Sequence, residues 1–178
     1  MSVCIISFSS RKGGNCGQIA AYLRSLHGDA KLYDFSDFNI HPCGGCAYEC
    51  FMSGGRCPWM DDREVELYEG ILGSTQAYYI LPNYCDYPCA NFFIFNERSQ
   101  CYFQGHPESA GAYGLVPKKF IVVSNTNERN FKEVLAYHVE GEPQILFLHA
   151  RKYGKVSIAG DIMTSKDAAE EIKAFADK

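Results

Sequence analysis

The chain has 178 residues, of which 47% are hydrophobic and 21% are charged, and its formal net charge is −4. These values exclude a disordered chain and argue against a general nucleic-acid surface, because such surfaces are basic. No apolar run approaches the roughly 18 residues of a membrane span, and no secretion signal is visible. We therefore expect one globular domain over residues 1–178, located in the cytoplasm and bound to neither nucleic acid nor membrane.

The first predicted element is a buried strand at Val3–Phe8, because this run is apolar and rich in β-branched residues. A loop of glycine, serine and cationic residues follows at 9–17, and apolar residues then repeat at helical spacing up to Gly28. A helix after such a loop aims backbone N–H groups and its positive end at an anion. The serine hydroxyls and Arg11 add donors, and Asn15 can cap the helix. This stretch therefore predicts a phosphate-binding loop.

Two common nucleotide-binding loops do not match this stretch. A Walker A loop ends in Gly-Lys-Ser/Thr, whereas Gly14 is followed here by Asn15 and Cys16. The dinucleotide fingerprint G-x-G-x-x-G is also absent, although Asp34 lies roughly 20 residues downstream, where that pattern places an acidic residue. The remaining alternative is an ordinary strand, turn and helix without a ligand.

The next part of the chain contains two more predicted strands and one helix. Ala30–Asp34 forms a second short strand, and residues 35–62 are irregular, with many glycines and prolines. An irregular link of this length is unusual in a compact domain unless something functional orders it. Glu64–Leu72 is predicted to be a helix that Asp62 caps, and Ala77–Leu81 is predicted to be a third strand.

After the third strand, the sequence predicts a helix that starts at Pro88 and runs towards Arg98, because proline suits the first turn of a helix. Tyr102–Pro117 is predicted to be a loop, since it contains three glycines and two prolines. Lys119–Asn125 is the clearest strand of the chain, and Asn127 can cap the helix that follows it.

The last part of the chain completes the pattern. Gln144–His149 is the fifth predicted strand, and Lys155–Ala159 is predicted to be a short extra one. Thr164 and Asp167 predict a capping box at the start of the last helix.

Strands and helices alternate five times along this chain, and the strands are short and continuously apolar. This pattern is typical of a parallel sheet that is covered on both faces. We expect an α/β three-layer sandwich with a five-stranded parallel sheet in the doubly wound, flavodoxin-like order 2-1-3-4-5. A ligand would lie at the carboxyl ends of strands 1, 3 and 4, which are followed by residues 9–16, 82–87 and 124–127.

Two of these loops resemble motifs of the NAD(P)H-dependent FMN reductases. Ser9–Cys16 is similar to the family's Gly-Ser-x-Arg-x-x-Gly-Asn-Thr phosphate loop, and Leu81–Tyr84 stands where the family has Thr/Ser-Pro-x-Tyr beside the flavin. Glu97–Arg98 stands where the family usually ends a helix in Asp-Arg. The resemblance extends from Val3 to about Arg98 and implies an FMN site.

The resemblance implies FMN contacts for ten residues of the three loops: Ser9, Arg11, Gly14, Asn15 and Cys16 at the phosphate, Pro82, Asn83 and Tyr84 along the isoalloxazine and ribityl chain, and Ser124 and Asn125 on the other side of the ring. This chain departs from the family's pattern at Phe8, Cys16 and Leu81. Because a thiol is a weaker donor than the family's threonine hydroxyl, one phosphate hydrogen bond is expected to be missing at Cys16.

Four of the nine cysteines, Cys43, Cys46, Cys50 and Cys57, are spaced C-x2-C-x3-C-x6-C in a cysteine-rich loop at about 41–62. An odd number of cysteines in a chain without a visible export signal is typical of reduced thiols. Together with the two aspartates that follow it, this segment resembles the cysteine segment of the iron–sulfur flavoprotein branch of the family. Three alternatives are open for the four side chains: a [4Fe–4S] cluster, a zinc ion, or unligated structural thiols.

The other cysteines have weaker signals. We expect Cys85 and Cys89 to lie at helical spacing with one face buried, and Cys4 and Cys101 to be core or incidental thiols.

The residues and the resemblance together predict an FMN-dependent oxidoreductase that passes electrons from NAD(P)H through the flavin to a quinone, another small molecule or a protein. One alternative is an electron-transfer module in which FMN and a [4Fe–4S] cluster exchange electrons with a ferredoxin-like partner. A second alternative is a non-catalytic binding domain stabilised by zinc or thiols. No catalytic side chain is assigned, because the flavin carries the electron chemistry. The resemblance also implies a homodimer or homotetramer.

Overall fold

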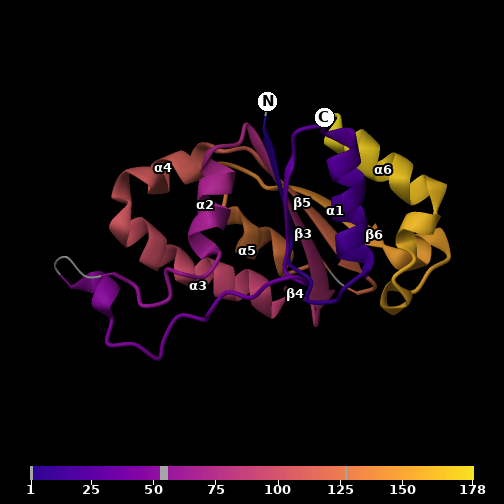
Figure 1. Ribbon diagram of the computed structural model, residues 1–178. Coiled ribbons are helices and arrows are strands. Elements are labelled where there is room, and N and C mark those ends of the chain that lie inside the picture. Colours follow the sequence, from indigo (N-terminus) through magenta and orange to yellow (C-terminus); the bar gives the residue numbers. More distant parts are fainter. Residues whose placement is uncertain (1, 53–55, 127) are drawn as a thin grey trace.

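The computed structural model describes residues 2–52, 56–126 and 128–178, and Figure 1 shows a central sheet with helices on both sides. The strands in this part of the chain are β1 (Val3–Ser7), β2 (Lys31–Asp34), β3 (Gln76–Tyr84), β4 (Tyr87–Pro88), β5 (Lys118–Ser124) and β6 (Gln144–His149). Within the described residues, five strands pair in parallel in the order β2-β1-β3-β5-β6, and β4 pairs antiparallel with β3. This confirms the predicted strand order.

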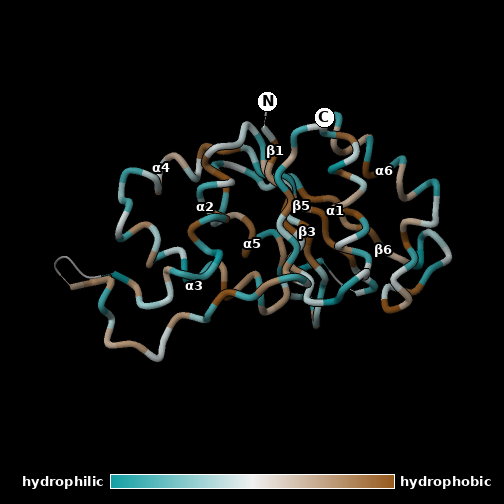
Figure 2. The backbone as a smooth tube through the Cα atoms, viewed as in Figure 1, coloured by the Kyte–Doolittle hydropathy of each residue, from teal (hydrophilic) through white to brown (hydrophobic). Residues whose placement is uncertain are grey.

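The helices cover both faces of the sheet, as the predicted three-layer sandwich requires. They are α1 (Asn15–Leu26), α2 (Glu64–Leu72), α3 (Ala90–Gly105), α4 (Pro107–Leu115), α5 (Phe131–Ala136) and α6 (Lys166–Ala176). Successive residues of β1 point to opposite faces, so Ile5 packs with Ile19 of α1 and Ile172 of α6, whereas Ile6 packs on the side of Phe92 of α3. Figure 2 shows the resulting concentration of hydrophobic residues in the central strands. In the described residues, every helix falls short of the length and apolarity that crossing a membrane requires.

The predicted loop at Tyr102–Pro117 is wrong, because most of it is helical. α3 continues to Gly105 and α4 follows almost directly. Pro107 occupies the first turn of α4, where its missing N–H costs no helical hydrogen bond. Tyr102 and Tyr113 are 4% and 7% exposed. Burial of their rings therefore outweighs the low helix propensity of the glycines.

The predicted helix start at Pro88 is also wrong. β3 continues to Tyr84, and the next two residues, Cys85 and Asp86, have positive φ angles of 52° and 66°. Such a pair is typical of a tight hairpin turn, which places Pro88 in β4. Cys85 lies on the exposed turn and Cys89 is buried just before α3, so the predicted helical spacing of these two cysteines is wrong as well.

Two local predictions near the C-terminus need correction. Residues 155–159 form no strand, and a 3₁₀ turn occupies Ser157–Ala159 instead. The cap of α6 is Ser165 and not Thr164, since the Ser165 hydroxyl accepts a hydrogen bond from the backbone of the first turn. The predicted cap at Asn127 lies outside the described residues.

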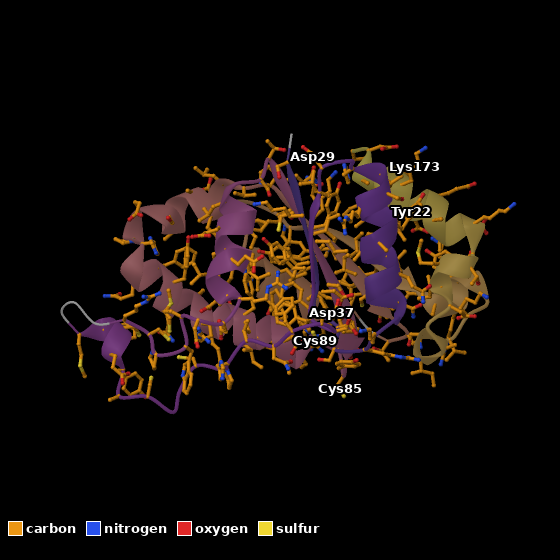
Figure 3. All side chains as sticks on the ribbon, in the orientation of Figure 1. Tyr22, Asp29, Asp37, Cys85, Cys89 and Lys173 are labelled. Atoms are coloured by element: carbon orange, nitrogen blue, oxygen red, sulfur yellow. The ribbon has the colours of Figure 1, made fainter. Side chains whose placement is uncertain are left out.

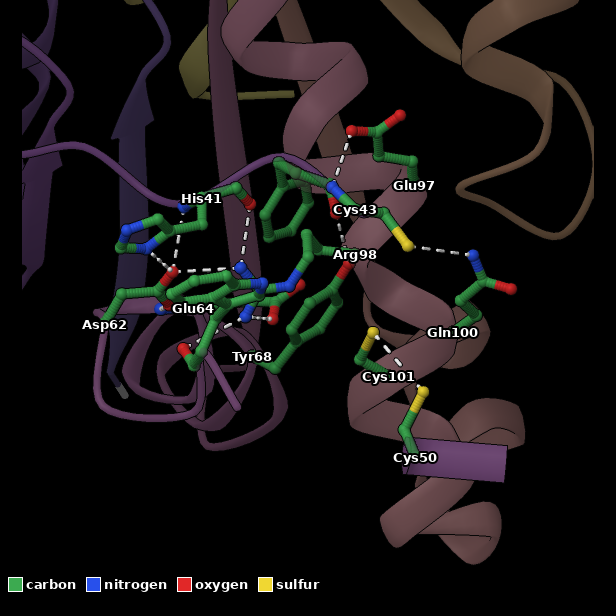
Figure 4. Close-up of polar contacts among 12 residues, drawn as sticks. His41, Cys43, Cys50, Asp62, Glu64, Tyr68, Glu97, Arg98, Gln100 and Cys101 are labelled. Carbon is green, nitrogen blue, oxygen red and sulfur yellow. Dashed lines mark hydrogen bonds and ion pairs between the residues drawn. The ribbon is translucent and has the colours of Figure 1, made fainter. Parts of the chain in front are cut away.

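The irregular stretch is confirmed for its described residues, 35–52 and 56–62, which include a 3₁₀ turn at Glu49–Phe51. We call its second part, residues 41–62, the cysteine-rich segment. A cation of α3 holds both ends of this segment: the fully buried Arg98 guanidinium donates to the His41 carbonyl at 2.7 Å and to the Asp62 carboxylate at 2.9 Å (Figure 4). A charged side chain and its hydrogen bonds therefore hold the two ends of the segment in place.

Two carboxylates share the Arg98 charge. Asp62 lies 2.9 Å from the guanidinium and Glu64 lies 2.8 Å from it. Burial of Glu64, which Arg98 only partly offsets and Asp62 reinforces, raises the pKa of that carboxyl to about 8. At Asp62, burial opposes ionisation, but backbone N–H donors and Arg98 outweigh it and lower the pKa. One guanidinium therefore faces two buried carboxyl groups, of which Asp62 ionises more readily than Glu64.

Candidate functional site

The carboxyl ends of β1, β3 and β5 meet at one edge of the sheet, the edge at which Figure 3 labels Cys85 and Cys89. A small pocket of about 80 Å³ lies there. Its lining comes from the predicted loops and from one turn near the C-terminus: Ser9, Arg11, Gly14, Asn15, Cys16, Pro82, Asn83, Tyr84, Val123, Ser157 and Ile158. The pocket thus brings together eight of the ten residues that the resemblance assigns to FMN.

The first loop is fixed to its neighbours before α1 begins. Phe8 continues the line of β1, and its N–H donates to a carbonyl of β3 at 2.9 Å. The Asn91 side chain of α3 then donates to the Phe8 carbonyl and to the Ser10 hydroxyl, each at 2.9 Å. A Cβ on Gly14 would lie 3.2 Å from the Arg11 carbonyl oxygen, so this close turn favours glycine.

The start of α1 and one cation give the pocket a positive character. α1 begins at Asn15, and its first-turn N–H groups have no acceptor within the helix. Arg11 is the one cationic side chain among the described residues that line the pocket. Its neighbour Lys12 is 84% exposed and pairs with Asp37 at the surface instead. The pocket is therefore suited to an anion that Arg11 contacts.

A turn from the other end of the chain contacts these same donors. We call Ser157–Gly160 the C-terminal turn. The Arg11 guanidinium donates to the Ile158 carbonyl, and the Asn15 amide donates to the Ser157 carbonyl at 2.8 Å. The Asn15 amide oxygen accepts from a backbone N–H just beyond the turn at 3.0 Å. The prediction that Asn15 caps α1 is therefore wrong, since its side chain holds backbone 142 residues away and the cap is Gly14.

The second and third loops are tied to each other. The Asn83 amide donates to the Ser124 hydroxyl at 2.8 Å, and this hydroxyl in turn accepts from the Thr126 N–H at 3.0 Å. Ser124 is buried and lies behind Asn83, outside the pocket lining. Asn125 lies 2.6 Å from the Ser157 hydroxyl, also outside the lining. These two predicted residues therefore position their neighbours in the described geometry.

The thiols near the pocket are neutral. Burial raises the pKa of Cys16 well above its ordinary value, and the nearby Cys89 and Asp34 raise it further. Burial also raises the pKa of Cys89 to about 11, and its thiol donates to the Phe8 carbonyl at 3.2 Å. Because the thiolate is the reactive form, neither cysteine is poised as a nucleophile at neutral pH.

A second, more open depression adjoins the pocket. Its volume is about 360 Å³, and it shares Ser9, Arg11 and Tyr84 with the pocket. The remaining walls come from the first loop and the start of α3: Phe8, Ser10, Cys89, Ala90 and Asn91. Cofactor sites usually measure about 300–1,000 Å³. The pocket alone is therefore too small for a whole cofactor, and the adjoining depression brings the combined space into this range.

Comparison with known proteins gives matches in structure alone, since neither a protein-family model nor a curated protein sequence matches the chain. The Trp repressor binding protein from Bacillus subtilis matches with a TM-score of 0.64 at 13% identity, covering 98% of this chain and 96% of that one. FerB, a flavoenzyme NAD(P)H:(acceptor) oxidoreductase from Paracoccus denitrificans, matches at 0.57 and 17% identity over 99% and 95%. The azoreductase AzrA matches at 0.54 and 13% identity over 100% of both chains. The fold is flavodoxin-like.

In a flavodoxin-like sheet the strand order reverses between β1 and β3, and ligands bind beside the carboxyl ends of the strands at this switch point. The pocket lies there, because its lining combines the loop after β1 with the end of β3. Its position thus follows from the topology, and its chemistry follows from the first loop.

The four cysteines proposed as metal ligands do not converge. The Cys43 sulfur accepts from Gln100 at 3.5 Å, whereas Cys50 lies 3.9 Å from Cys101. Across residues 2–52, 56–126 and 128–178, no three side chains of His, Cys, Asp or Glu are grouped as a metal site would need. The geometry therefore does not fit a [4Fe–4S] cluster or zinc on Cys43, Cys46, Cys50 and Cys57, and that ligand set stays a prediction from sequence.

Three lining residues are missing from the sequence prediction: Val123, Ser157 and Ile158. Val123 belongs to a predicted strand and lies one residue before Ser124, where the predicted ligand-binding loop 124–127 begins. Ser157 and Ile158 have a local signal, since Gly154 and Gly160 bracket them with φ angles of 66° and 74°. Those glycines indicate a turn, but no local pattern places that turn against the first loop.

Proposed function

We propose that the protein binds FMN in the pocket and the adjoining depression, which together we call the crevice. We further propose that it acts as an oxidoreductase that passes electrons from NAD(P)H to an acceptor. The observation that carries the proposal is the pocket at the switch point, where Arg11 and the start of α1 border the same space as Pro82–Tyr84. Two structures of similar fold support it by analogy, since one is described as an NAD(P)H:(acceptor) oxidoreductase and the other as an azoreductase.

The donors at the pocket fit a phosphate monoester. The Arg11 guanidinium offers a fork of N–H groups, Ser9 offers a hydroxyl, and the start of α1 offers backbone N–H groups. Tyr84 offers an aromatic ring that is 59% exposed, with Pro82 and Asn83 beside it. When bound, FMN supplies the two-electron and one-electron chemistry, and these residues bind and orient it.

The acceptor and the assembly are part of the proposal. We propose a quinone, another small molecule or a ferredoxin-like protein as the acceptor, and a homodimer or homotetramer as the assembly. Exposed aromatic rings support such contacts: Tyr84, which lines the pocket, is 59% exposed, and Tyr87 and Phe93, nearby in the sequence, are 48% and 38% exposed.

The test compares FMN with riboflavin, which has the same ring and no phosphate. Protein stripped of bound flavin is titrated into each, and the flavin fluorescence is followed. We expect saturable binding of FMN at one per chain and much weaker binding of riboflavin. The loaded protein is then mixed without oxygen with NADH or NADPH, and the visible flavin absorbance is expected to bleach. Flavin fluorescence that stays unchanged at saturating protein would refute the FMN site, and equal affinity for both flavins would refute the phosphate loop.

A further inference from the structure

Two thiols are in contact between the cysteine-rich segment and α3, away from the crevice, and a third thiol lies near them. Cys50 stands on the 3₁₀ turn at Glu49–Phe51, and its thiol donates to the Cys101 sulfur of α3 at 3.9 Å (Figure 4). Cys57 lies close enough to Cys101 to raise the pKa of its thiol. All three are free cysteines. The sequence predicts Cys101 to be a core or incidental thiol, and the structure buries it beside Cys50.

This thiol cluster is separate from the proposed flavin site. Asn91, in the first turn of α3, contacts the first loop, whereas Cys101 lies near the other end of that helix. At about 1.5 Å per residue, the distance along the helix axis from the first turn to Cys101 is roughly 16 Å. The cluster therefore makes no contact with the crevice, and the inference below does not depend on FMN binding.

α3 holds the segment close to the cluster through hydrogen bonds and charge. Arg98 and Cys101 are three residues apart and so lie on one face of the helix. Arg98 binds the His41 carbonyl and Asp62, and the neighbouring Glu97 carboxylate accepts from the Cys43 N–H at 2.9 Å. These contacts keep Cys50 beside Cys101, so that a bond between the two sulfurs would be an intramolecular reaction at high effective concentration.

The thiols differ in their access to solvent. Cys50 is partly exposed, whereas Cys57 and Cys101 are 7% and 6% exposed. Burial and the adjacent Cys57 and Cys50 raise the pKa of the Cys101 thiol, so Cys101 reacts only after losing its proton and its attack is the slower of the two exchange steps. A small soluble reagent therefore reaches Cys50 first, and Cys101 is placed to react with whatever forms there.

We propose that Cys50 and Cys101 form a redox dithiol that is oxidised by low-molecular-weight disulfides. The Cys50 thiolate attacks one sulfur of the small disulfide, which forms a mixed disulfide and releases one thiol. Cys101 then loses its proton to solvent and attacks the Cys50 sulfur, which forms the protein disulfide and releases the second thiol. Two protein thiols are oxidised and one small disulfide is reduced to two thiols. The sulfurs need to approach from 3.9 Å to about 2.05 Å, which side-chain rotation supplies.

The product would join the cysteine-rich segment covalently to α3, across 51 positions of sequence. A disulfide in a reducing compartment is usually transient, so this bond is expected to form under oxidising conditions and to open with a reducing thiol.

Peptide mapping after oxidation tests the assignment. The full-length protein is incubated with oxidised glutathione, alkylated, unfolded and digested with trypsin. Cleavage after Lys31, Arg56, Arg63, Arg98 and Lys118 separates the three thiols. A Cys50–Cys101 bond joins peptide 32–56 to peptide 99–118, whereas a Cys57–Cys101 bond joins peptide 57–63 to peptide 99–118. We expect the first linked pair, and its loss on treatment with dithiothreitol. A stable glutathione adduct on peptide 32–56, or the second linked pair, would overturn the proposal.

Three variants make the test specific. Cys50→Ser is expected to abolish the linked pair, whereas Cys46→Ser, which changes a cysteine in the same tryptic peptide, is expected to retain it. Cys101→Ser is expected to trap the mixed disulfide, so that glutathione stays bound to peptide 32–56. Because Cys101 is buried, thermal melting of this variant checks that it is folded. A linked pair that persists in Cys50→Ser would overturn the assignment.

Discussion

Arg11 and Lys12 are adjacent cations with opposite surroundings. Arg11 lines the pocket, whereas Lys12 is 84% exposed and pairs with Asp37. We expect Arg11→Ala to weaken FMN binding by about 1.5–3 kcal/mol, the range of a charge-assisted hydrogen bond, because the proposed phosphate would lose its forked donor. Lys12→Ala removes the same charge from the same loop and is expected to change the affinity by less than about 0.5 kcal/mol.

Fluorescence titration of FMN with the two variants measures this difference. A thermal melt of Arg11→Ala accompanies it, since Arg11 also holds the Ile158 carbonyl. Equal losses of affinity in both variants would show that general positive charge, and not the Arg11 geometry, attracts the ligand.

The residues of the first loop could be predicted as a group, because strand, glycine loop and helix are consecutive in sequence. The partners of their side chains could not be predicted. Asn15 has the residue type of a helix cap, yet its amide binds backbone 142 residues away. Ser124 has the position of a ligand-binding hydroxyl, yet it supports Asn83. A sequence pattern specifies which groups are near a strand end, but the fold decides which of them face the ligand.

α3 carries a buried cation whose removal would take the guanidinium away from two buried carboxyl groups. Arg98 is fully buried and lies 2.9 Å from Asp62 and 2.8 Å from Glu64. Arg98→Met is expected to lower the free energy of unfolding by about 3–5 kcal/mol, because breaking a buried ion pair leaves an uncompensated charge. Arg63→Met is the matched control. Arg63 pairs with Glu66 at the surface, so we expect its loss to cost about 1 kcal/mol or less.

Urea unfolding of the two variants checks this expectation. If Arg98→Met lowers the free energy of unfolding as little as Arg63→Met does, the expectation is wrong. Arg98 would then hold the ends of the cysteine-rich segment without contributing much to the stability of the domain.

Elements were predictable where the local pattern and the burial agree. The three central strands β1, β3 and β5 are mostly apolar, and the structure buries them between two layers of helices. The wrong predictions arise where tertiary burial outweighs local propensity. α4 forms although it contains two glycines, because Tyr113 packs in the core. β3 extends past its predicted end because a hairpin turn with two positive φ angles returns the chain to it.

The stability of the whole molecule should depend on pH through one buried histidine. His138 is 3% exposed, and its Nδ1 lies 2.8 Å from the Tyr113 hydroxyl, which in turn lies 2.9 Å from the Tyr79 hydroxyl. Within the described residues its Nε2 is buried without a hydrogen-bond partner. Burial, with a smaller effect of the nearby Lys118 charge, lowers the pKa of His138 to about 4.

A pKa that is lower in the folded state stabilises the protein at high pH. The contribution of His138 is therefore complete above its unfolded pKa of about 6.5 and is lost as the pH falls towards 4, by about 3 kcal/mol. Urea unfolding between these pH values measures the loss. His138→Gln keeps an acceptor for Tyr113 and does not titrate, so its stability is expected to fall less steeply. Identical acid slopes for the two proteins would contradict this assignment.

The overall topology was the most predictable property, because alternating strands and helices leave few right-handed arrangements. The strand order and the site's edge of the sheet both follow from it. The C-terminal turn could not be predicted, because its place beside Arg11 depends on the path of the chain after β6 and not on any local pattern.

The contacts of the C-terminal turn make ligand binding an exchange reaction. A phosphate that takes the Nη1–H donor of Arg11 displaces the Ile158 carbonyl, and one that takes the amide N–H that Asn15 now donates displaces the Ser157 carbonyl. The observed association rate should therefore level off at high ligand concentration, at the rate with which the turn releases these donors. The measured affinity would likewise be weaker than the contacts alone predict, in proportion to the fraction of molecules whose donors are free.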